Sequence, residues 1–330
     1  MTHKLSAVPK NLLEMTRHFT NGDICVDFVA AMRWPKGVEC PHCGSKRVSY
    51  LTSRRIWKCM NKVCHKQFSV KTGSVFEDSP VALDKWLMAV WLVVNCKNGI
   101  SSYELARDIH VTQKTAWFML HRIRLALQQG SWEKMGGPEG GPVEVDETFI
   151  GPNPRKMHSS RRRKLQTGEK ASYHNGIVMG MLDRDLRKVR AKVIPNVKRA
   201  TLQAEILDGV EKKATIYTDQ AVGYDKLYKD FIHHTVNHLE EYVCGHVHTQ
   251  GIDNFWSLLK RGLKGTYVAV EPFHLSRYTD EQVFRYNNRA TKDNPLDDRD
   301  RFMLAVSQIA GKRLTYAGLT GKVGETSEPF

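Results

Sequence analysis

The sequence has no uninterrupted apolar run of about 18 residues, the length that a membrane-spanning helix needs. Its first residues, MTHKLSAVPKNLLEM, also lack the apolar stretch of a secretory signal peptide. These two absences argue against an integral membrane protein and against a secreted one. We therefore expect a cytoplasmic protein that has no membrane partner.

Acidic residues are in deficit, because 35 Asp and Glu face 50 Lys and Arg and leave a net charge of +15. An excess of this size favours a polyanionic partner, most simply nucleic acid, and argues against an enzyme that binds small molecules alone. A solvated basic surface and an anionic membrane are the alternatives. At 330 residues, 41% of them apolar, the chain is long enough for two or three domains with buried cores.

Cysteine is rare, with seven residues, and lasting structural disulfides are not expected in a reducing cytosol. Four cysteines form two pairs, Cys40 and Cys43 in CPHC and Cys59 and Cys64 in CMNKVC, with fifteen residues between the pairs. Two such turns joined by a hairpin are typical of a tetrahedral zinc site with four thiolates, and GSKRVSYLTSRRIWK supplies two strand-like runs. We predict a zinc ribbon over residues 37–75 whose folding depends on the metal. The histidine after the last cysteine is the alternative fourth ligand, and four coincidentally spaced core cysteines are the other alternative.

Helical patterns flank the ribbon. Residues 1–36 contain short amphipathic segments, and region 76–130 contains SSYELARDIHVTQKTAWFMLHRIRLALQ, two helical runs separated by a break. This spacing is typical of a helix-turn-helix, whose second helix enters the major groove of double-stranded DNA. An ordinary helical hairpin is the alternative. The residues that would face the base edges lie at the start of the second helix: Thr112, Gln113, Lys114 and Thr115.

Glycine and proline concentrate at residues 131–142, which we interpret as a linker. Beyond it VEVDETFIG, HNGIVMGMLDRD, KVRAKVIP and ATIYTDQ read as strands, with a helix at 199–212 between the last two. Strands that alternate with helices predict an α/β domain, placed at residues 143–312 and followed by a tail at 313–330. A polar segment with seven basic residues, from Arg155 to Lys170, lies between the first two strands and is a candidate for polyanion binding.

Two acids lie next to apolar strand residues, where the burial of an unpaired charge would be unfavourable. Asp146 follows VEV and Asp219 ends TIYTD, so we expect both to reach one sheet edge and to bind a cation, which compensates their charge. Asp253 lies on a predicted helix with Lys260 seven positions later, close to two turns, so both point to one side. Carboxylates and a lysine in this arrangement fit a two-metal site for phosphoryl transfer that uses Mg²⁺.

Six motifs, in this order, make the sequence similar to the zinc-ribbon DDE transposases of bacterial insertion sequences, in particular the ISXO-two-like group: CPHCGS, FSVKTGSVFEDS, VEVDETFIG, YTDQAVGY, HTQGIDNFWSLLKRGLKGTY and HLSRYTDEQVFRYNNR. The resemblance covers most of the chain and implies an RNase H-like, retroviral-integrase-type catalytic domain with a mixed sheet. Asp146 and Asp219 match the first two catalytic acids of that family, and Lys260 matches its basic position. Asp253 stands where relatives carry Glu; members described as using Asn at the third position would move that role to Asn254.

The resemblance implies a transposase that binds the terminal inverted repeats of an insertion sequence, cleaves the 3′ ends and joins them to target DNA. It also implies catalytic Mg²⁺ or Mn²⁺, structural zinc, and a homo-oligomer, dimer or larger, that acts at the bacterial nucleoid. Arg261 and Lys264 are candidates for gripping DNA near the scissile phosphate. An inactive, transposase-derived DNA-binding protein is the main alternative, and a nuclease without strand transfer is a further one.

Overall fold

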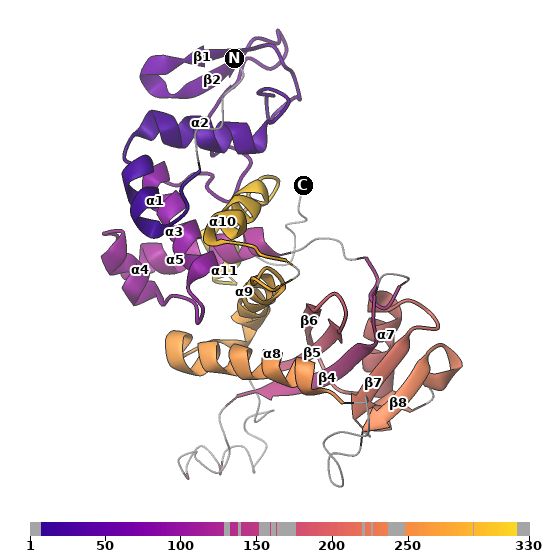
Figure 1. Cartoon of the computed structure of the whole chain (residues 1–330). Helices are drawn as coiled ribbons and strands as arrows, with labels where there is room; N and C mark the ends of the chain where they lie inside the picture. The colour runs from indigo at the N-terminus through magenta and orange to yellow at the C-terminus, as the bar shows by residue number, and fades with distance from the viewer. Residues whose placement is uncertain are drawn as a thin grey trace. The chain divides into compact units, whose positions relative to one another are not determined.

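The computed structural model describes residues 8–128, 133–137, 140–151, 159, 163, 176–219, 222–225, 227–236, 248–292 and 294–321. The chain divides into two compact units, unit 1 from residues 1–128 and 288–330 and unit 2 from residues 129–287 (Figure 1). Within the described ranges, no helix is long and apolar enough to cross a membrane. The basic segment from Arg155 to Lys170 lies outside the described residues, apart from residues 159 and 163.

Unit 1 combines a small sheet with helices. The sheet is antiparallel, in the order β1-β2-β3, and its central strand β2 brings the buried Trp57 against Phe68 with ring centroids 6.0 Å apart. Short 3₁₀ turns occur in this unit at Thr52–Arg54 and in unit 2 at Val222–Tyr224, Leu227–Lys229 and Pro272–His274. The helices and strands of unit 1 are α1 (Leu12–His18), α2 (Gly22–Arg33), β1 (Val48–Leu51), β2 (Ile56–Cys59), β3 (Gln67–Phe68), α3 (Leu83–Asn95), α4 (Ser102–Asp108), α5 (Gln113–Leu127), α10 (Asp298–Ser307) and α11 (Tyr316–Leu319).

Helix α10 belongs to unit 1, although we expected the α/β domain to continue to residue 312. It packs against α2 and α3, where the fully buried Phe302 stacks on Phe28 at 5.6 Å and lies 5.4 Å from Trp91. The burial of these aromatic rings fixes the position of the helix. The chain therefore returns to its N-terminal unit at about residue 288, a connection that the linear pattern of strands and helices does not reveal.

The predicted pair of helices before the linker is present as α4 and α5. Ser101 caps α4 in a capping box with Glu104, and the Thr112 hydroxyl accepts the Thr115 amide at the start of α5. Buried Leu105 and Ala116 lie on the faces that these helices turn inward. The start of the second helix at Thr112, which the sequence indicated, is thus confirmed.

Unit 2 is a mixed sheet with helices on both faces, as the α/β assignment predicted. The strand order is β6-β5-β4-β7-β8; β5 is antiparallel to both β4 and β6, whereas β7 is parallel to both β4 and β8. Its elements are β4 (Val143–Ile150), β5 (Gly176–Asp183), β6 (Lys188–Ile194), α7 (Arg199–Gly209), β7 (Thr215–Asp219), β8 (Ile232–Val236), α8 (Gln250–Arg261), a π-helix (Gly262–Tyr267) and α9 (Leu275–Asn287).

Alternation along β4 divides the core of unit 2 into two layers. Val143 and Val145 join a cluster with Leu202 and Ile206 of α7, on one face of the sheet. Ile150, on the other face, joins a cluster formed with residues of α8 and α9. Because neighbouring strand residues point to opposite faces, Asp146 lies on the α8 face and Glu147 on the α7 face.

Candidate active site

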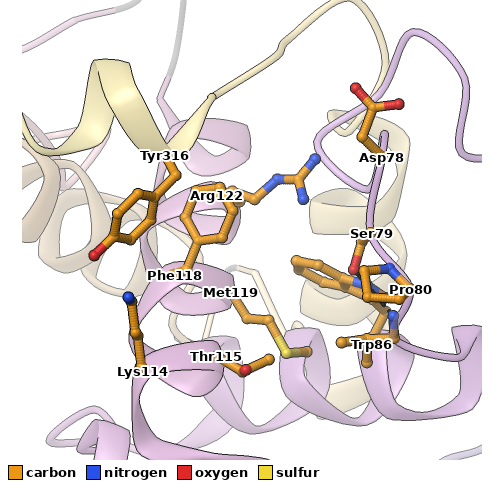
Figure 2. A pocket seen from close by; sticks show the side chains of 11 residues that line it. Asp78, Ser79, Pro80, Trp86, Lys114, Thr115, Phe118, Met119, Arg122 and Tyr316 are labelled. Carbon is orange, nitrogen blue, oxygen red and sulfur yellow. Dashed lines mark hydrogen bonds between the residues drawn. The ribbon is translucent and has the colours of Figure 1, made fainter. Parts of the chain in front are cut away.

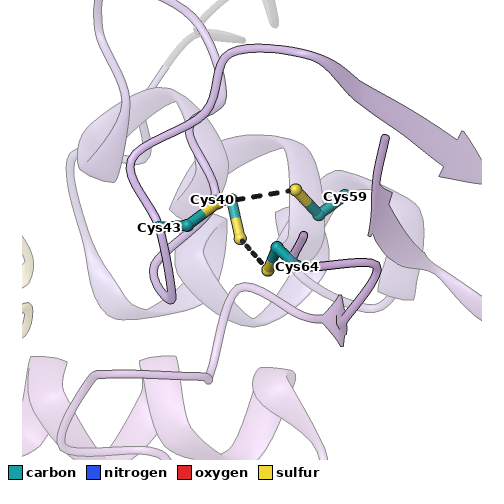
Figure 3. Close-up of side chains that lie close together, drawn as sticks. All are labelled: Cys40, Cys43, Cys59 and Cys64. Carbon is teal, nitrogen blue, oxygen red and sulfur yellow. Dashed lines mark hydrogen bonds between the residues drawn. The ribbon is translucent and has the colours of Figure 1, made fainter. Parts of the chain in front are cut away.

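The four paired cysteines gather into one cluster (Figure 3). Their sulfur atoms all lie within 4.8 Å of one another; Cys40 Sγ is 3.8 Å from Cys64 Sγ, and Cys43 Sγ is 3.6 Å from Cys59 Sγ. Neighbouring sulfurs of a Zn–S₄ tetrahedron with bonds of about 2.3 Å are about 3.8 Å apart. The cluster fits structural zinc, and it contains the four cysteines that the sequence singled out.

The second cysteine pair has a longer spacer than the first, and the backbone shows how it is accommodated. In the first pair the Cys43 amide donates to the Cys40 carbonyl, whereas in the second the Cys64 amide donates to the carbonyl of Asn61. The second turn thus begins at Asn61, two residues after Cys59. His65, the alternative ligand, is exposed and is not a member of the cluster.

Asp146 and Asp219 lie on neighbouring parallel strands of unit 2. Strands β4 and β7 pair Val143 with Ile216 and Glu144 with Tyr217. Residues in register on adjacent strands share a face of the sheet. Glu144 and Tyr217 therefore share a face, and by alternation Asp146 and Asp219, each two residues farther along its strand, project to that same face.

Helix α8 crosses the same face and contacts Asp146 directly. Ile252, Phe255 and Trp256 are buried against the sheet, and Trp256 Nε1 donates a hydrogen bond of 2.7 Å to Asp146 Oδ2. Asp253 precedes Trp256 by three positions, about one turn, so both lie on one side of the helix. Trp256 is thus a core residue that also binds the first acid.

The acids share one electrostatic neighbourhood. Burial raises the pKa of Asp146 to about 7; the Trp256 hydrogen bond lowers it, and the charges of Glu147 and Asp253 raise it. Burial also raises the pKa of Glu147, with the Tyr224 hydroxyl lowering it and Asp219 raising it. Asp253 thus acts on Asp146, and Asp219 acts on Glu147. These carboxylates create a negative electrostatic potential, which favours the binding of a cation.

A metal fit can be tested on the donor atoms themselves. The acids offer hard carboxylate oxygens, the ligands that Mg²⁺ and Mn²⁺ prefer, on one face of one sheet. Among the described residues, however, the cysteine cluster is the one group of three or more potential ligands close enough to hold a single ion. Asp146, Asp219 and Asp253 thus have the donor chemistry that a hard cation requires.

Sequence reasoning missed a buried acid two residues before Asp146. The carboxylate of Glu144 is 1% exposed, accepts the Ile252 amide of α8 at 2.9 Å, and pairs with Arg184 Nε at 2.6 Å. Arg184 also contacts His248 Nδ1 at 2.7 Å. This network attaches the N-terminus of α8, which has no side-chain cap, to the sheet. Alternation in VEVDE was the available signal, because it places Glu144 and Asp146 on one face.

The predicted DNA-gripping cations follow along α8 and into the π-helix. Lys260 is partly buried, one turn beyond Trp256 and seven positions beyond Asp253, so it shares their side of the helix. Arg261 and Lys264 are exposed. Lys260 therefore continues the side of α8 that begins with Asp253.

The four residues expected to face DNA bases differ in their surroundings. Thr112 and Lys114 are exposed; Gln113 Nε2 donates to Ser102, and Thr115 bonds to Thr112. Lys114 Nζ lies 4.8 Å from the centroid of the Tyr316 ring. Figure 2 shows Lys114 and Thr115 at a cavity of about 220 Å³ in unit 1, whose lining residues are Asp78, Ser79, Pro80, Val81, Trp86, Lys114, Thr115, Phe118, Met119, Arg122 and Tyr316.

Comparison with known proteins gives matches over both units. The family described as ISXO2-like transposase domain matches residues 139–287, and the family described as transposase zinc-ribbon domain matches residues 21–67. A Halobacterium salinarum protein named as an uncharacterized protein in transposable element ISH50 is 32% identical over 247 residues, 72% of this chain and 81% of the relative. A Haemophilus influenzae transposase-like protein is 35% identical over 106 residues, 32% of this chain and 85% of the relative.

Proposed function

Because the chain belongs to the ISXO2-like transposase family, we propose that it is an active DDE-type DNA transposase. It binds the terminal inverted repeats of an insertion sequence, cleaves their 3′ ends and joins them to target DNA by metal-dependent phosphoryl transfer. The observation that carries this proposal is that Asp146 and Asp219 each lie two residues beyond the Glu144–Tyr217 pair of adjacent parallel strands, while the helix that bears Asp253 contacts Asp146 through Trp256. The mixed five-stranded sheet with helices on both faces supports an RNase H-like fold.

In this proposal Asp146, Asp219 and the third acid hold Mg²⁺ or Mn²⁺. When bound, the ions activate the attacking oxygen and stabilise the leaving one during in-line displacement. Lys260, on the same side of α8, contacts a phosphate next to the reacting one, and exposed Arg261 and Lys264 bind the backbone beyond it.

Two observations favour Asp253 over Asn254 as the third ligand. The charge of Asp253 raises the pKa of Asp146, so the two carboxylates are near each other. Asp253 also lies one turn from Trp256, which is bonded to Asp146, whereas Asn254 is two positions from Trp256 and points elsewhere. A side chain one methylene shorter than glutamate therefore still starts from the correct side of the helix.

Recognition of the DNA ends is assigned to unit 1. In this proposal the zinc ribbon and the start of α5 contact the inverted repeat, with Thr112 and Lys114 as the exposed candidates for the major groove. Gln113 and Thr115 support the helix start through their bonds to Ser102 and Thr112. Two ends must be joined, so the active form is a homo-oligomer, dimer or larger, in which each protomer binds one end.

The test is a cleavage and strand-transfer assay on DNA that carries the element ends, with Mg²⁺ or Mn²⁺. We expect Asp146→Asn and Asp219→Asn to bind the ends normally and to lose cleavage by at least about a thousandfold. Asp253→Asn should be similarly inactive, and Asn254→Ala should retain activity. Binding without cutting by the wild-type protein would overturn the proposal in favour of the inactive DNA-binding alternative. Cleavage without joining would indicate a nuclease.

A further inference from the structure

The indole of Trp256 is held next to Asp146 by its burial, by a ring contact and by a hydrogen bond. Its ring is 4% exposed, its Nε1–H donates to Asp146 Oδ2 at 2.7 Å, and its neighbour Phe255 packs on it edge-on at 5.1 Å. The helix that carries it is attached to the sheet one turn earlier, where the Ile252 amide donates to Glu144. The ring therefore has little freedom to move away from the carboxylate.

Gly180 of β5 makes room for this contact. It is the register partner of Asp146, and a Cβ atom built at Gly180 would lie 2.6 Å from the Trp256 ring and 2.9 Å from Ile252. Real Cβ atoms do not approach so closely, so any side chain at this position would displace the ring. The strand next to the acid is thus open at the point where the indole lies.

The chemistry of an indole suits a carboxylate that must bind a cation. An indole N–H only donates, carries no charge and does not give up its proton near neutral pH. It can fix the orientation of a carboxylate without neutralising it, whereas a lysine or arginine in the same place would compete with the metal. Partners of this kind orient metal ligands and affect metal affinity by about 10- to 100-fold.

We propose that Trp256 is the positioning residue for Asp146. The Trp256 N–H holds one oxygen of the Asp146 carboxylate so that the carboxylate is oriented towards the catalytic cation, and Gly180 leaves room for the Trp256 ring. This inference rests on the proposed function, because it gives Asp146 a cation to bind. Trp256 touches neither substrate nor metal and acts through Asp146.

The test measures Mn²⁺ binding to the full-length, zinc-loaded protein without DNA, by electron paramagnetic resonance of the free ion. Trp256→Phe removes the N–H and keeps an aromatic ring. The matched control is Trp86→Phe, since Trp86 is 1% exposed and donates its own N–H to Ser79 Oγ at 3.1 Å, in unit 1. We expect Trp256→Phe to weaken the binding that depends on Asp146 by about tenfold, and Trp86→Phe to leave it unchanged. Gly180→Ala, which keeps the N–H but displaces the ring, should weaken it similarly.

The outcomes separate this inference from the proposed function. If Asp146→Asn abolishes Mn²⁺ binding but Trp256→Phe binds like the wild type, the positioning role is wrong and the metal site stands. If Asp146→Asn has no effect on Mn²⁺ binding, the metal site and the positioning role both fall.

A spectroscopic readout does not depend on the variants folding. In the wild-type protein labelled with 5-fluorotryptophan, Mg²⁺ should shift the fluorine resonance of Trp256 and leave that of Trp86 in place. The resonances are assigned by replacing the other tryptophans in turn. An unmoved Trp256 resonance at saturating Mg²⁺ would overturn the inference.

Discussion

The cysteine cluster of unit 1 and the carboxylates of unit 2 are both suited to metal, but they are organised differently. The four cysteines fall within 25 consecutive residues, 40 to 64, and their sulfurs already lie within 4.8 Å of one another. The acids come from positions 146, 219 and 253, on two strands and a helix.

This difference shows what each region depends on. The ribbon buries few large side chains, so its zinc must supply much of its folding free energy. The acids are carried by a sheet with a core on both faces, and Glu144 and Trp256 hold α8 in place without any ion. Metal should therefore be structural in unit 1 and dispensable for folding in unit 2.

The largest effect expected is loss of zinc from unit 1. Cys40→Ser, or a strong chelator, should release the metal and unfold the ribbon, because apparent zinc-binding free energies reach about 10 kcal/mol or more. Cys96→Ser, outside the cluster, is the control and should retain one zinc per chain. Zinc content by spectrophotometric release and hydrogen exchange of β1 and β2 measure the effect. If hydrogen exchange of β4 and β7 increased to the same extent, the conclusion that zinc stabilises unit 1 and not unit 2 would be wrong.

The next largest effect tests what holds unit 2. Glu144→Ala leaves Arg184 and the Ile252 amide without their buried partner, and breaking such a pair costs about 3 to 5 kcal/mol. Chemical denaturation and hydrogen exchange of α8 should show the loss, while zinc content stays unchanged. Glu144→Gln keeps an acceptor for the amide and should lose less. Equal stability of the alanine variant and the wild type would show that α8 is held by its apolar face alone.

The third prediction concerns how the stability of unit 2 depends on pH through the charge of Asp146. The pKa of Asp146 is about 7 in the folded chain, against 3.8 for an ordinary aspartate, so the folded state binds more protons between these values. Its contribution to stability therefore falls as the pH rises from about 4 to about 7 and stays low above that range. Without Mg²⁺, Asp146→Asn should be more stable than the wild type at pH 8, by up to about 4 kcal/mol.

Thermal melts across pH 5 to 8 check this third prediction. The difference in stability between Asp146→Asn and the wild type should narrow at pH 5, because Asp146 is then protonated in the folded chain and no buried charge is left. Added Mg²⁺ at pH 8 should stabilise the wild type but not the variant. If the difference in stability between Asp146→Asn and the wild type did not change with pH, the charge of Asp146 would not destabilise the folded chain.

The smallest expected effect is the loss of the helix cap at Thr112. Thr112→Ala removes the hydroxyl that accepts the Thr115 amide and should cost about 1 kcal/mol of unit 1 stability. Zinc content and Mn²⁺ binding should stay unchanged, since the change is confined to the start of α5. Thr112→Ser, which keeps the hydroxyl, is the matched control. A drop in zinc content would show that the ribbon depends on this helix more than we infer.

Much of the local structure could be predicted from the sequence. The start of the second helix at Thr112, the strands around Asp146 and Asp219, and the four clustered cysteines depend on residues near one another in the chain. The return of α10 to unit 1 could not be predicted, because it depends on Phe302 finding Phe28 and Trp91 across the whole chain.

The sequence by itself determined the family, the mixed α/β class of unit 2 and the set of candidate ligands, because motifs, alternation and spacing are properties of neighbouring residues. Only the tertiary structure decided that Glu144 binds the start of α8, that the indole of Trp256 bonds to Asp146, and that Gly180 leaves room for it. These contacts join residues up to 110 positions apart. Their existence depends on strand register and helix packing, which emerge only when the whole core of unit 2 is buried.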